Sequence, residues 1–335
     1  MLTKLFRFTV LLLSTAFLSA CAGEGVYHED SGSVFHTVYH IKYKSPRPLT
    51  GEIEKEFALF DASLDPFNKE SIIAKVNANQ EVEVDKWFTT VFNKAMEVSA
   101  NSDGAFDITC APFINLWGFG PGAAEKEVTP EEIDSIKQFV GYQKVRLKGG
   151  KVEKDDPRLI LNCSGIAKGY ACDVVGELLE RYGVKNYMVE IGGEVRMKGR
   201  NPKGECWRIG IDKPIDDPSS TVNEIQAVVA VCDGGAVATS GNYRNFYVKD
   251  GKKYGHTINP HTGYPVQTDV LSATIVAKDG ITADAYTKLF MVLGKEEGIK
   301  LAQKLKGEFE YYLIYVENDH YAIAQSEGME RYMVK

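Results

Sequence analysis

The residues best suited to chemistry form a run at 255–265, Gly-His-Thr-Ile-Asn-Pro-His-Thr-Gly-Tyr-Pro. Its side chains offer imidazole, hydroxyl and amide groups, while its prolines and glycines fix the backbone path and bury little apolar area. Such a run predicts a loop that presents side chains, although a tight structural turn would have the same composition. His256 and His261 are its candidate acids or bases, because an imidazole exchanges protons near neutral pH.

A second candidate lies at 164–170, Ser-Gly-Ile-Ala-Lys-Gly-Tyr. A predicted strand at 158–162 leads through this turn into a predicted helix at 166–182. Free N–H groups at a helix start attract anions, and Lys168 in the first turn adds a positive charge, so a diphosphate suits this place. The glycine spacing matches neither a Walker A loop nor a dinucleotide fingerprint. A capped helix with an exposed lysine is the other interpretation.

Asp284, Thr287 and Lys288 share one face of a predicted helix, because they lie at positions i, i+3 and i+4. The rest of that helix is apolar, so its carboxylate either faces solvent or has a partner. One interpretation is a surface pair of Asp284 with Lys288, which would stabilise the protein by only about 0.3–0.5 kcal/mol.

These runs belong to a set of six short islands along the chain. They are Phe-Asp-Ile-Thr-Cys-Ala-Pro (106–112) running on to Trp-Gly-Phe-Gly (117–120), Ser-Gly-Ile-Ala-Lys-Gly-Tyr-Ala-Cys-Asp (164–173), Glu-Ile-Gly-Gly-Glu (190–194), Thr-Ser-Gly-Asn-Tyr-Arg (239–244), the run at 255–265, and Ala-Asp-Ala-Tyr-Thr-Lys (283–288). In order and rough spacing they resemble the ApbE family of FAD:protein FMN transferases, or flavin transferases. The resemblance extends from about Ser33 to the last predicted strands.

The resemblance implies a reaction. A threonine hydroxyl of a flavin-accepting redox subunit, of the Nqr or Rnf type, would attack the FAD phosphorus nearer the flavin. FMN would stay on the target, AMP would leave, and Mg²⁺ would assist. Two alternatives use the same site: a Mg²⁺-dependent FAD pyrophosphatase, with water as the acceptor, and a flavin-binding lipoprotein without catalysis.

The resemblance also implies roles for residues of this sequence. The catalytic residues would be His256, Asp284 and Lys168. The Mg²⁺ ligands would be the carbonyl of Gly165 and the side chains of Asp284 and Thr287. The residues expected to contact FAD are Phe35, Phe67, Ala105, Phe106, Asp107, Asn162, Lys168 and Ile258. Gly192 and Gly193 are expected to be turn glycines that let the backbone approach a ligand. Ser240, Gly241 and Tyr243 are expected to shape the same cavity.

Two residues depart from the family pattern at the implied metal site. Lys288 stands where the family usually has threonine, and lysine cannot donate an oxygen ligand. Asn162 stands where aspartate is usual. Both changes move the site toward positive charge, which suggests that the Lys288 ammonium partly replaces the metal or that the metal binds more weakly.

The first residues have the pattern of a bacterial lipoprotein signal. Lys4 and Arg7 precede an apolar run at 8–18, and Leu18-Ser19-Ala20-Cys21 is a lipobox. Residues 1–20 are expected to be removed, leaving a lipidated Cys21 that holds the protein at the membrane on the periplasmic side. Residues 21–33 are expected to form a tether. An ordinary secretory signal cut after Ala20 is the alternative.

Composition of the whole chain sets further bounds. A formal net charge of −7 argues against a nucleic-acid partner, because phosphate binding needs a basic surface. Besides Cys21 there are five cysteines, an odd number that leaves at least one free thiol. They are Cys110, Cys163, Cys172, Cys206 and Cys232. No Cys-x-x-Cys pair or zinc spacing occurs, so mostly reduced, structural cysteines are expected.

The pattern of elements indicates an α+β fold, with mixed or antiparallel sheets, helices packed outside, and a single catalytic domain over 34–335. Predicted strands outnumber the crossover helices, which argues against a βαβ repeat. Helices are expected near 49–63, 71–78, 86–101, from Thr129 onward, at 166–182, and as a pair within 279–305. Strands are expected near 38–43, 143–148, 158–162, 186–191, 194–198, 206–212, 225–232, 235–239, 244–249, 270–277, 310–316 and 320–325.

Overall fold

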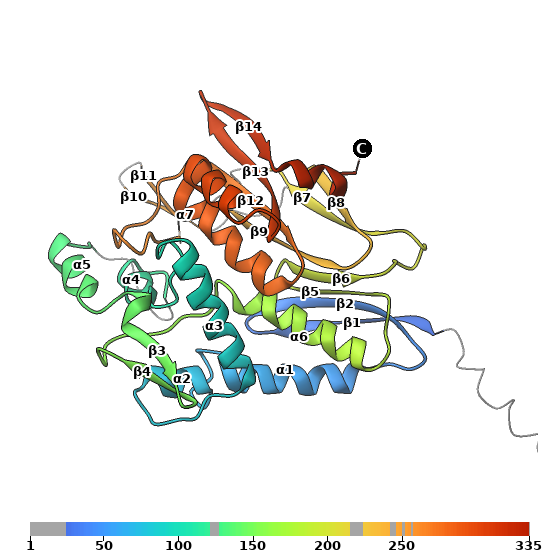
Figure 1. Cartoon of the computed structure of the whole chain (residues 1–335), viewed down its shortest axis with the longest axis horizontal. Coiled ribbons are helices and arrows are strands. Elements are labelled where there is room, and N and C mark those ends of the chain that lie inside the picture. The colour runs from blue at the N-terminus through green and yellow to red at the C-terminus, as the bar shows by residue number, and fades with distance from the viewer. Residues whose placement is uncertain are drawn as a thin grey trace, which may run out of the picture.

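The protein is built on one antiparallel sheet with helices against one face (Figure 1). This computed structural model describes residues 25–120, 127–214, 224–241, 246–249, 252–255 and 257–334. The sheet has eight strands in the order β1-β2-β5-β6-β9-β12-β13-β14, and each neighbouring pair is antiparallel. The predicted α+β class is confirmed.

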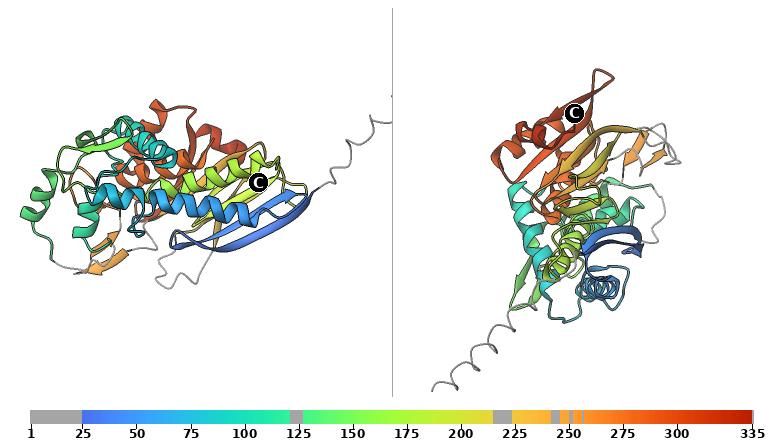
Figure 2. Two further views of the ribbon diagram at one scale, coloured as in Figure 1. Left: turned by 90° about the horizontal axis from the view of Figure 1, so that it is seen from below. Right: turned by 90° about the vertical axis from the view of Figure 1, so that its right-hand side faces the viewer.

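The sheet strands are β1 (Val26–Val34), β2 (Thr37–Ser45), β5 (Tyr187–Ile191), β6 (Glu194–Lys198), β9 (Gly235–Gly241), β12 (Val270–Ala277), β13 (Phe309–Glu317) and β14 (His320–Gln325). Three further antiparallel pairs are β3 (Val145–Lys148) with β4 (Lys151–Lys154), β7 (Trp207–Asp212) with β8 (Ile225–Val231), and β10 (Phe246–Lys249) with β11 (Lys252–Gly255). In the right-hand view of Figure 2 the N-terminal strands lie at the bottom and the C-terminal strands at the top.

The helices are α1 (Thr50–Leu64), α2 (Ile72–Asn77), α3 (Lys86–Asn101), α4 (Ala111–Leu116), α5 (Pro130–Lys137), α6 (Ala167–Arg181) and α7 (Gly280–Lys304), with short 3-10 turns at Tyr142–Lys144 and Glu327–Tyr332. Helix α6 packs on β5 and β6, and α7 packs on β9, β12 and β13. Helices α1 and α3 contact α6 and α7 in turn. The two helices that carry the candidate chemistry therefore lie between the sheet and an outer helical layer.

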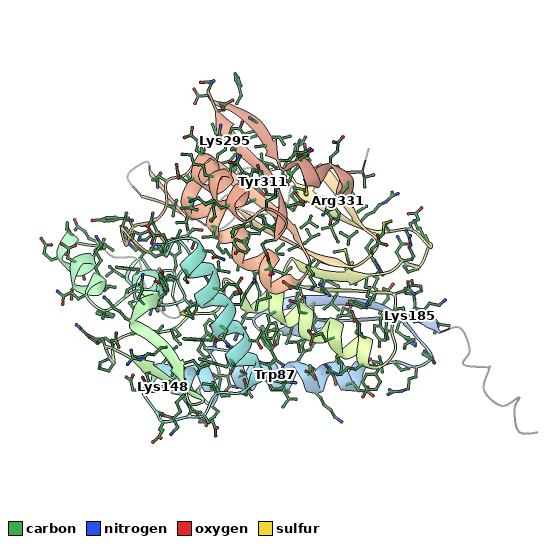
Figure 3. All side chains as sticks on the ribbon, viewed as in Figure 1. Trp87, Lys148, Lys185, Lys295, Tyr311 and Arg331 are labelled. Atoms are coloured by element: carbon green, nitrogen blue, oxygen red, sulfur yellow. A yellow bond between two sulfur atoms is a disulfide. The ribbon has the colours of Figure 1, made fainter. Side chains whose placement is uncertain are left out.

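The alternation of the strands gives the sheet two apolar faces. In β9, Ala236 and Ala238 belong to the large core beneath the helices, while Val237 belongs to a second core. The second core is closed by the β7–β8 pair and the C-terminal turn, through Trp207, Val229 and Met329. Charged side chains such as Lys148 and Lys185 lie at the periphery (Figure 3).

Local signals explain where several helices start. Asp85 accepts a hydrogen bond from the Phe88 N–H and caps α3, as its sequence position predicts. Thr129 and Glu132 form a reciprocal capping box at α5, with Pro130 in the first turn.

Two predicted segments have a different secondary structure from the one expected. Residues 26–33, assigned to the tether, instead belong to strand β1, which pairs with β2 along its length. No strand forms at 158–162, because the backbone there bonds to side chains and loops. The Asn77 amide bonds both the N–H and the carbonyl of Leu161, and the Asn162 N–H donates to the Ile108 carbonyl.

The expected helical pair at 279–305 is confirmed, because α7 consists of two helical segments that meet at Gly294, where the backbone is not helical (φ 75°). Among the cysteines, Cys206 and Cys232 form a disulfide across the β7–β8 pair. Cys110, Cys163 and Cys172 are free and buried, as expected. Within the described residues, no helix combines the length and apolar character needed to cross a membrane.

Candidate active site

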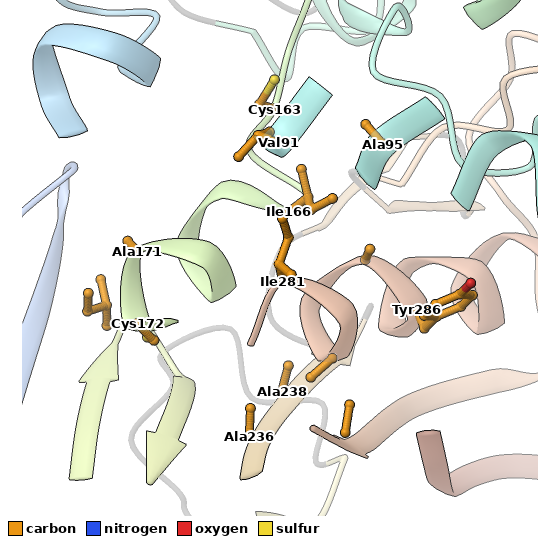
Figure 4. Packing of buried hydrophobic residues seen from close by; sticks show 14 of the residues in the cluster. Val91, Ala95, Cys163, Ile166, Ala171, Cys172, Ala236, Ala238, Ile281 and Tyr286 are labelled. Carbon is orange, nitrogen blue, oxygen red and sulfur yellow. The ribbon is translucent and has the colours of Figure 1, made fainter. Parts of the chain in front are cut away.

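The first turns of α6 and α7 meet at the centre of the molecule. Their backbones approach so closely that a Cβ on Gly169 would lie 2.1 Å from the Gly280 carbonyl oxygen. Ile166 and Ile281 beside them belong to the same core cluster (Figure 4). Only glycine at position 169 permits this contact, which explains the second glycine of the Gly-Ile-Ala-Lys-Gly run.

Carboxylates fix this junction from both sides. Asp173 of α6 accepts hydrogen bonds from the N–H groups of Gly280 (2.7 Å) and Ile281 (2.8 Å) at the start of α7. Asp284 of α7 accepts one from the Gly169 N–H (3.0 Å) in α6. The two helices therefore hold each other by reciprocal side-chain bonds to their N-terminal turns.

Asp284 is fully buried at 0% exposure, so the surface-pair interpretation is wrong. Its partner is nevertheless Lys288, whose Nζ lies 3.0 Å from Asp284 Oδ1. The same ammonium lies 2.7 Å from Ser240 Oγ and 3.3 Å from Thr287 Oγ1. The three oxygens thus match the three N–H donors of one ammonium group.

A second buried ion pair joins α6 to β6. Lys168 Nζ lies 2.8 Å from Glu194 Oε1, and Glu194 is 4% exposed. The other carboxylate oxygen, Oε2, has no hydrogen-bond partner within the described part of the chain. The site therefore holds two ammonium groups and two carboxylates, which compensate one another's burial.

The pKa shifts follow from this arrangement. Burial alone would raise the pKa of Asp284, but the charges of Lys288 and Lys168 outweigh it and this pKa is lowered. Burial opposes the charge of Lys168, yet Asp284 and Glu194 together raise its pKa. Burial raises the pKa of Glu194, and the charge of Asp284 adds to the shift. Asp284 and Lys168 are therefore held in their charged forms.

Two cavities open on either side of the turn before α6. The first, of about 130 Å³, is lined by Ala105, Phe106, Asp107, Asn162, Ser164, Gly165, Ile258 and Lys288 among others. The second, of about 260 Å³, is lined by Phe35, Phe67, Ser164, Ala167 and Lys168 among others. Ser164 lines both, so the two cavities meet at the helix start.

The structure thus brings together the residues predicted from distant parts of the sequence. Phe67 is 53% exposed, and the centroid of its ring lies 4.4 Å from the centroid of the His36 ring. The Asp107 carboxylate is engaged within the protein, because it accepts hydrogen bonds from Thr109 and from the Tyr142 N–H. Burial raises the pKa of Asp107. Asn162 accepts a bond from the Ser164 N–H (2.8 Å) and so shapes the turn.

The expected turn glycines and the residues expected to shape the cavity are divided. Ser240 contacts Lys288 directly, and a Cβ on Gly192 would lie 3.3 Å from Lys168 Cδ. Gly192, Gly193 and Gly241 line a third cavity, between the sheet and strand β7. Three predicted positions, Cys21, Tyr243 and His256, lie outside the described residues.

Two important residues carried no predicted role. Glu194 and Asp173 each end one of the six islands, at 190–194 and 164–173, and both are buried. A carboxylate at the start of an alternating strand, or on the apolar face of a helix, is the signal that could have identified them.

The arrangement around Lys288 does not fit a magnesium ion at the implied ligands. Mg²⁺ requires oxygen ligands at about 2.0–2.1 Å in octahedral geometry. The side-chain oxygens of Asp284 and Thr287 already bond to Lys288, and the Thr287 hydroxyl also donates to the Asp284 carbonyl (2.7 Å). Among the described residues no cluster of three histidine, cysteine or carboxylate side chains converges elsewhere. The metal assignment to Gly165, Asp284 and Thr287 stays a prediction.

The fold and the site define a class of protein: an α+β enzyme fold with a two-part, charged cavity at a helix start. The family model described as the ApbE family matches residues 35–313. The chain belongs to the ApbE family.

Known proteins similar to this chain cover nearly all of it. A FAD:protein FMN transferase of Vibrio cholerae is 36% identical over 88% of this chain and 90% of its own length. Another from Haemophilus influenzae is 34% identical over 98% of both chains. The solved flavin transferase ApbE from Vibrio cholerae matches with a TM-score of 0.81 at 33% identity, over 92% of this chain and 99% of that one. The apo flavinyl transferase ApbE of Pseudomonas stutzeri also has a TM-score of 0.81, at 30% identity, over 92% and 97%.

Proposed function

We propose that this chain is a FAD:protein FMN transferase, which moves FMN from FAD to a threonine hydroxyl of a target redox protein. The observation that carries the proposal is the pair of cavities joined at Ser164, with Lys168 in the adjoining first turn of α6. A dinucleotide has two bulky ends and a central diphosphate, and this shape matches it. The near full-length similarity to FAD:protein FMN transferases supports the same reaction.

The chemistry is a phosphoryl transfer. The threonine oxygen forms a bond to the phosphorus nearer the flavin, the bond from that phosphorus to the bridging oxygen breaks, and AMP leaves with the bridging oxygen. The chain's own task is to position the diphosphate and to neutralise its charge. Lys168 supplies a fixed positive charge at the helix start, and Phe35 and Phe67 offer aromatic surface to one end of the dinucleotide.

His256 is proposed to take the hydroxyl proton, because its ordinary pKa lies near neutrality. The proposal rests on the sequence resemblance and on the next residues along the chain, since Thr257 and Ile258 line the smaller cavity. A His256→Ala variant is expected to bind FAD as the parent does and to lose most of its transfer rate. Equal transfer rates in the two proteins would remove His256 from the chemistry.

The protein is further proposed to be a lipoprotein, anchored by Cys21 on the periplasmic side of a membrane. The lipobox supports the anchor. The Cys206–Cys232 disulfide is the kind of bond that persists in an oxidising compartment outside the cytosol. The proposed targets are flavin-carrying subunits of the Nqr or Rnf type, read through a Ser/Thr-Gly-Ala-Thr-like segment beside the membrane.

One assay tests the function. The protein is incubated with FAD and a purified Nqr- or Rnf-type subunit, once with its acceptor threonine and once with that threonine replaced by valine. Covalent flavin fluorescence on the first target alone supports the transferase. Free FMN and AMP without labelled target would instead indicate a hydrolase, and bound but unchanged FAD a flavin carrier.

A further inference from the structure

The Lys288 ammonium contacts the side-chain oxygens of this site. We propose that the Lys288 ammonium takes the place of a divalent metal ion, so that FAD binding and flavin transfer do not require one. This inference rests on the proposed function for its substrate, but its central observation is a contact within the protein.

The first argument is the position of the ammonium. Nζ of Lys288 lies within 3.3 Å of the side-chain oxygens of Asp284, Thr287 and Ser240. Two of these residues are the implied metal ligands. All three side chains direct their oxygens to the ammonium, as they would to a bound cation.

The second argument is its relation to the cavity. Lys288 lines the smaller cavity with Asn162 and Gly165. A Cβ on Gly165 would lie 3.6 Å from Lys288 Cγ, so the lysine stem runs along the backbone whose carbonyl was the third implied ligand. The Lys288 side chain is 26% exposed, while Asp284 beneath it is wholly buried. The ammonium thus stands between the buried carboxylate and the space for the diphosphate.

The third argument is the charge of the site. Relative to the family pattern, Asn162 removes one negative charge and Lys288 adds one positive charge. Together they add two positive charges, the charge of one magnesium ion. A divalent ion about 3 Å from the ammonium would meet strong repulsion in a partly buried site. With Lys168 paired to Glu194 and Lys288 to Asp284, the site is balanced without a metal.

The test begins with the unaltered mature protein, stripped with EDTA. Titration calorimetry with MgCl₂ alone is expected to show no saturable binding below about 1 mM. FAD affinity, measured by flavin fluorescence in EDTA and in Mg²⁺, is expected to differ by less than about threefold. Saturable one-to-one Mg²⁺ binding, or FAD affinity that collapses in EDTA, would overturn the proposal.

A variant sharpens the test. Lys288→Thr restores a hydroxyl, and is expected to gain saturable Mg²⁺ binding and to lose at least about tenfold in FAD affinity in EDTA, regained with Mg²⁺. Lys300→Thr on the same helix is the matched control, because Lys300 is 61% exposed and pairs only with Glu297 among the described residues. If Lys288→Thr fails to fold, the titrations of the unaltered protein still decide the question.

The flavin-transfer assay separates this inference from the proposed function. Transfer that is as fast in EDTA as in Mg²⁺ supports both. Transfer only with Mg²⁺ would keep the function and overturn the metal replacement. If no covalent flavin forms under either condition, the proposed function falls, and the Mg²⁺ titration alone decides the role of Lys288.

Discussion

The N-termini of α6 and α7 lie side by side, yet they satisfy their free N–H groups in different ways. At α7, Asp279 accepts a bond from the Thr282 N–H, and Asp173 accepts those of Gly280 and Ile281. At α6, Asp284 accepts a bond from the Gly169 N–H, but no side chain caps the helix from the N-cap position, and Ser164 in the turn before it lines both cavities. The carboxylates at the α7 start position the fold, whereas the more open α6 start beside Lys168 is suited to an anionic ligand.

The largest expected effect is the loss of the contact between the two helices. Gly169→Ala is expected to cost about 3 kcal/mol or more of unfolding free energy, because its Cβ would overlap the Gly280 backbone and the Asp284 side chain. Urea unfolding followed by circular dichroism would measure it. Gly51→Ala is the control, since nothing lies within 4 Å of its Cβ position in α1. If both variants unfold at the same urea concentration, the close approach is not needed.

The α7 start is expected to depend on Asp173. Asp173→Asn should lower the unfolding free energy by about 1–3 kcal/mol. An asparagine side chain offers one acceptor oxygen, whereas the N–H groups of Gly280 and Ile281 each need one. Asp279→Asn at the same helix start is the control, since asparagine caps helices as well as aspartate does.

Asp173 is also expected to make the unfolding free energy depend on pH. Burial raises the pKa of Asp173 to about 7, although Arg196 and the two N–H donors oppose the shift. Between the ordinary aspartate pKa, about 3.9, and pH 7 the folded state therefore binds more protons than the unfolded state. The contribution of Asp173 to the unfolding free energy should fall as pH rises through this window. Subtracting the Asp173→Asn profile from that of the parent isolates this term. A difference that is flat or that rises with pH would contradict the assignment.

The α6 start is expected to depend on Lys168. Lys168→Met should weaken FAD binding about 10–100-fold, because it removes the fixed charge and leaves Glu194 unpaired. Flavin fluorescence titration measures the loss. Lys185→Met, at an exposed lysine, is the control. Unchanged FAD affinity in Lys168→Met would show that the α6 start does not hold the diphosphate.

The smallest effect is expected at the rim of the larger cavity. Phe67→Ala should weaken FAD binding only a few-fold, in line with a stacking contribution of about 0.5–1.5 kcal/mol, since this ring is half exposed. Tyr321→Ala, at another exposed aromatic residue on β14, serves for comparison. A loss as large as that of Lys168→Met would instead make the aromatic rim the main anchor.

The sequence predicted the secondary-structure elements and the residues that form the site. It did not predict the hydrogen bonds and burial within the site as well. Helix α3 and strands β5, β6 and β14 lie close to their expected ranges, because apolar periodicity and caps are local signals. The missing strand at 158–162 depends on Asn77, whose distance in the sequence hides the contact. Spacing placed Asp284 and Lys288 together, but only the packing of α6 on α7 decides that Asp284 is buried. The Cys206–Cys232 bond likewise depends on strand pairing that cysteine counting cannot reveal.

Gly294 divides α7 into two rods. Its backbone leaves helical geometry, and Asp269 accepts a bond from the Lys295 N–H at the start of the second rod. The first rod carries Asp284, Thr287 and Lys288, and the second runs on toward β13. The second rod folds back on the first, since a Cβ on Gly298 would lie 2.5 Å from Phe290 Cδ1. The break at Gly294 therefore lets the end of the longest helix support the segment that carries the reactive side chains.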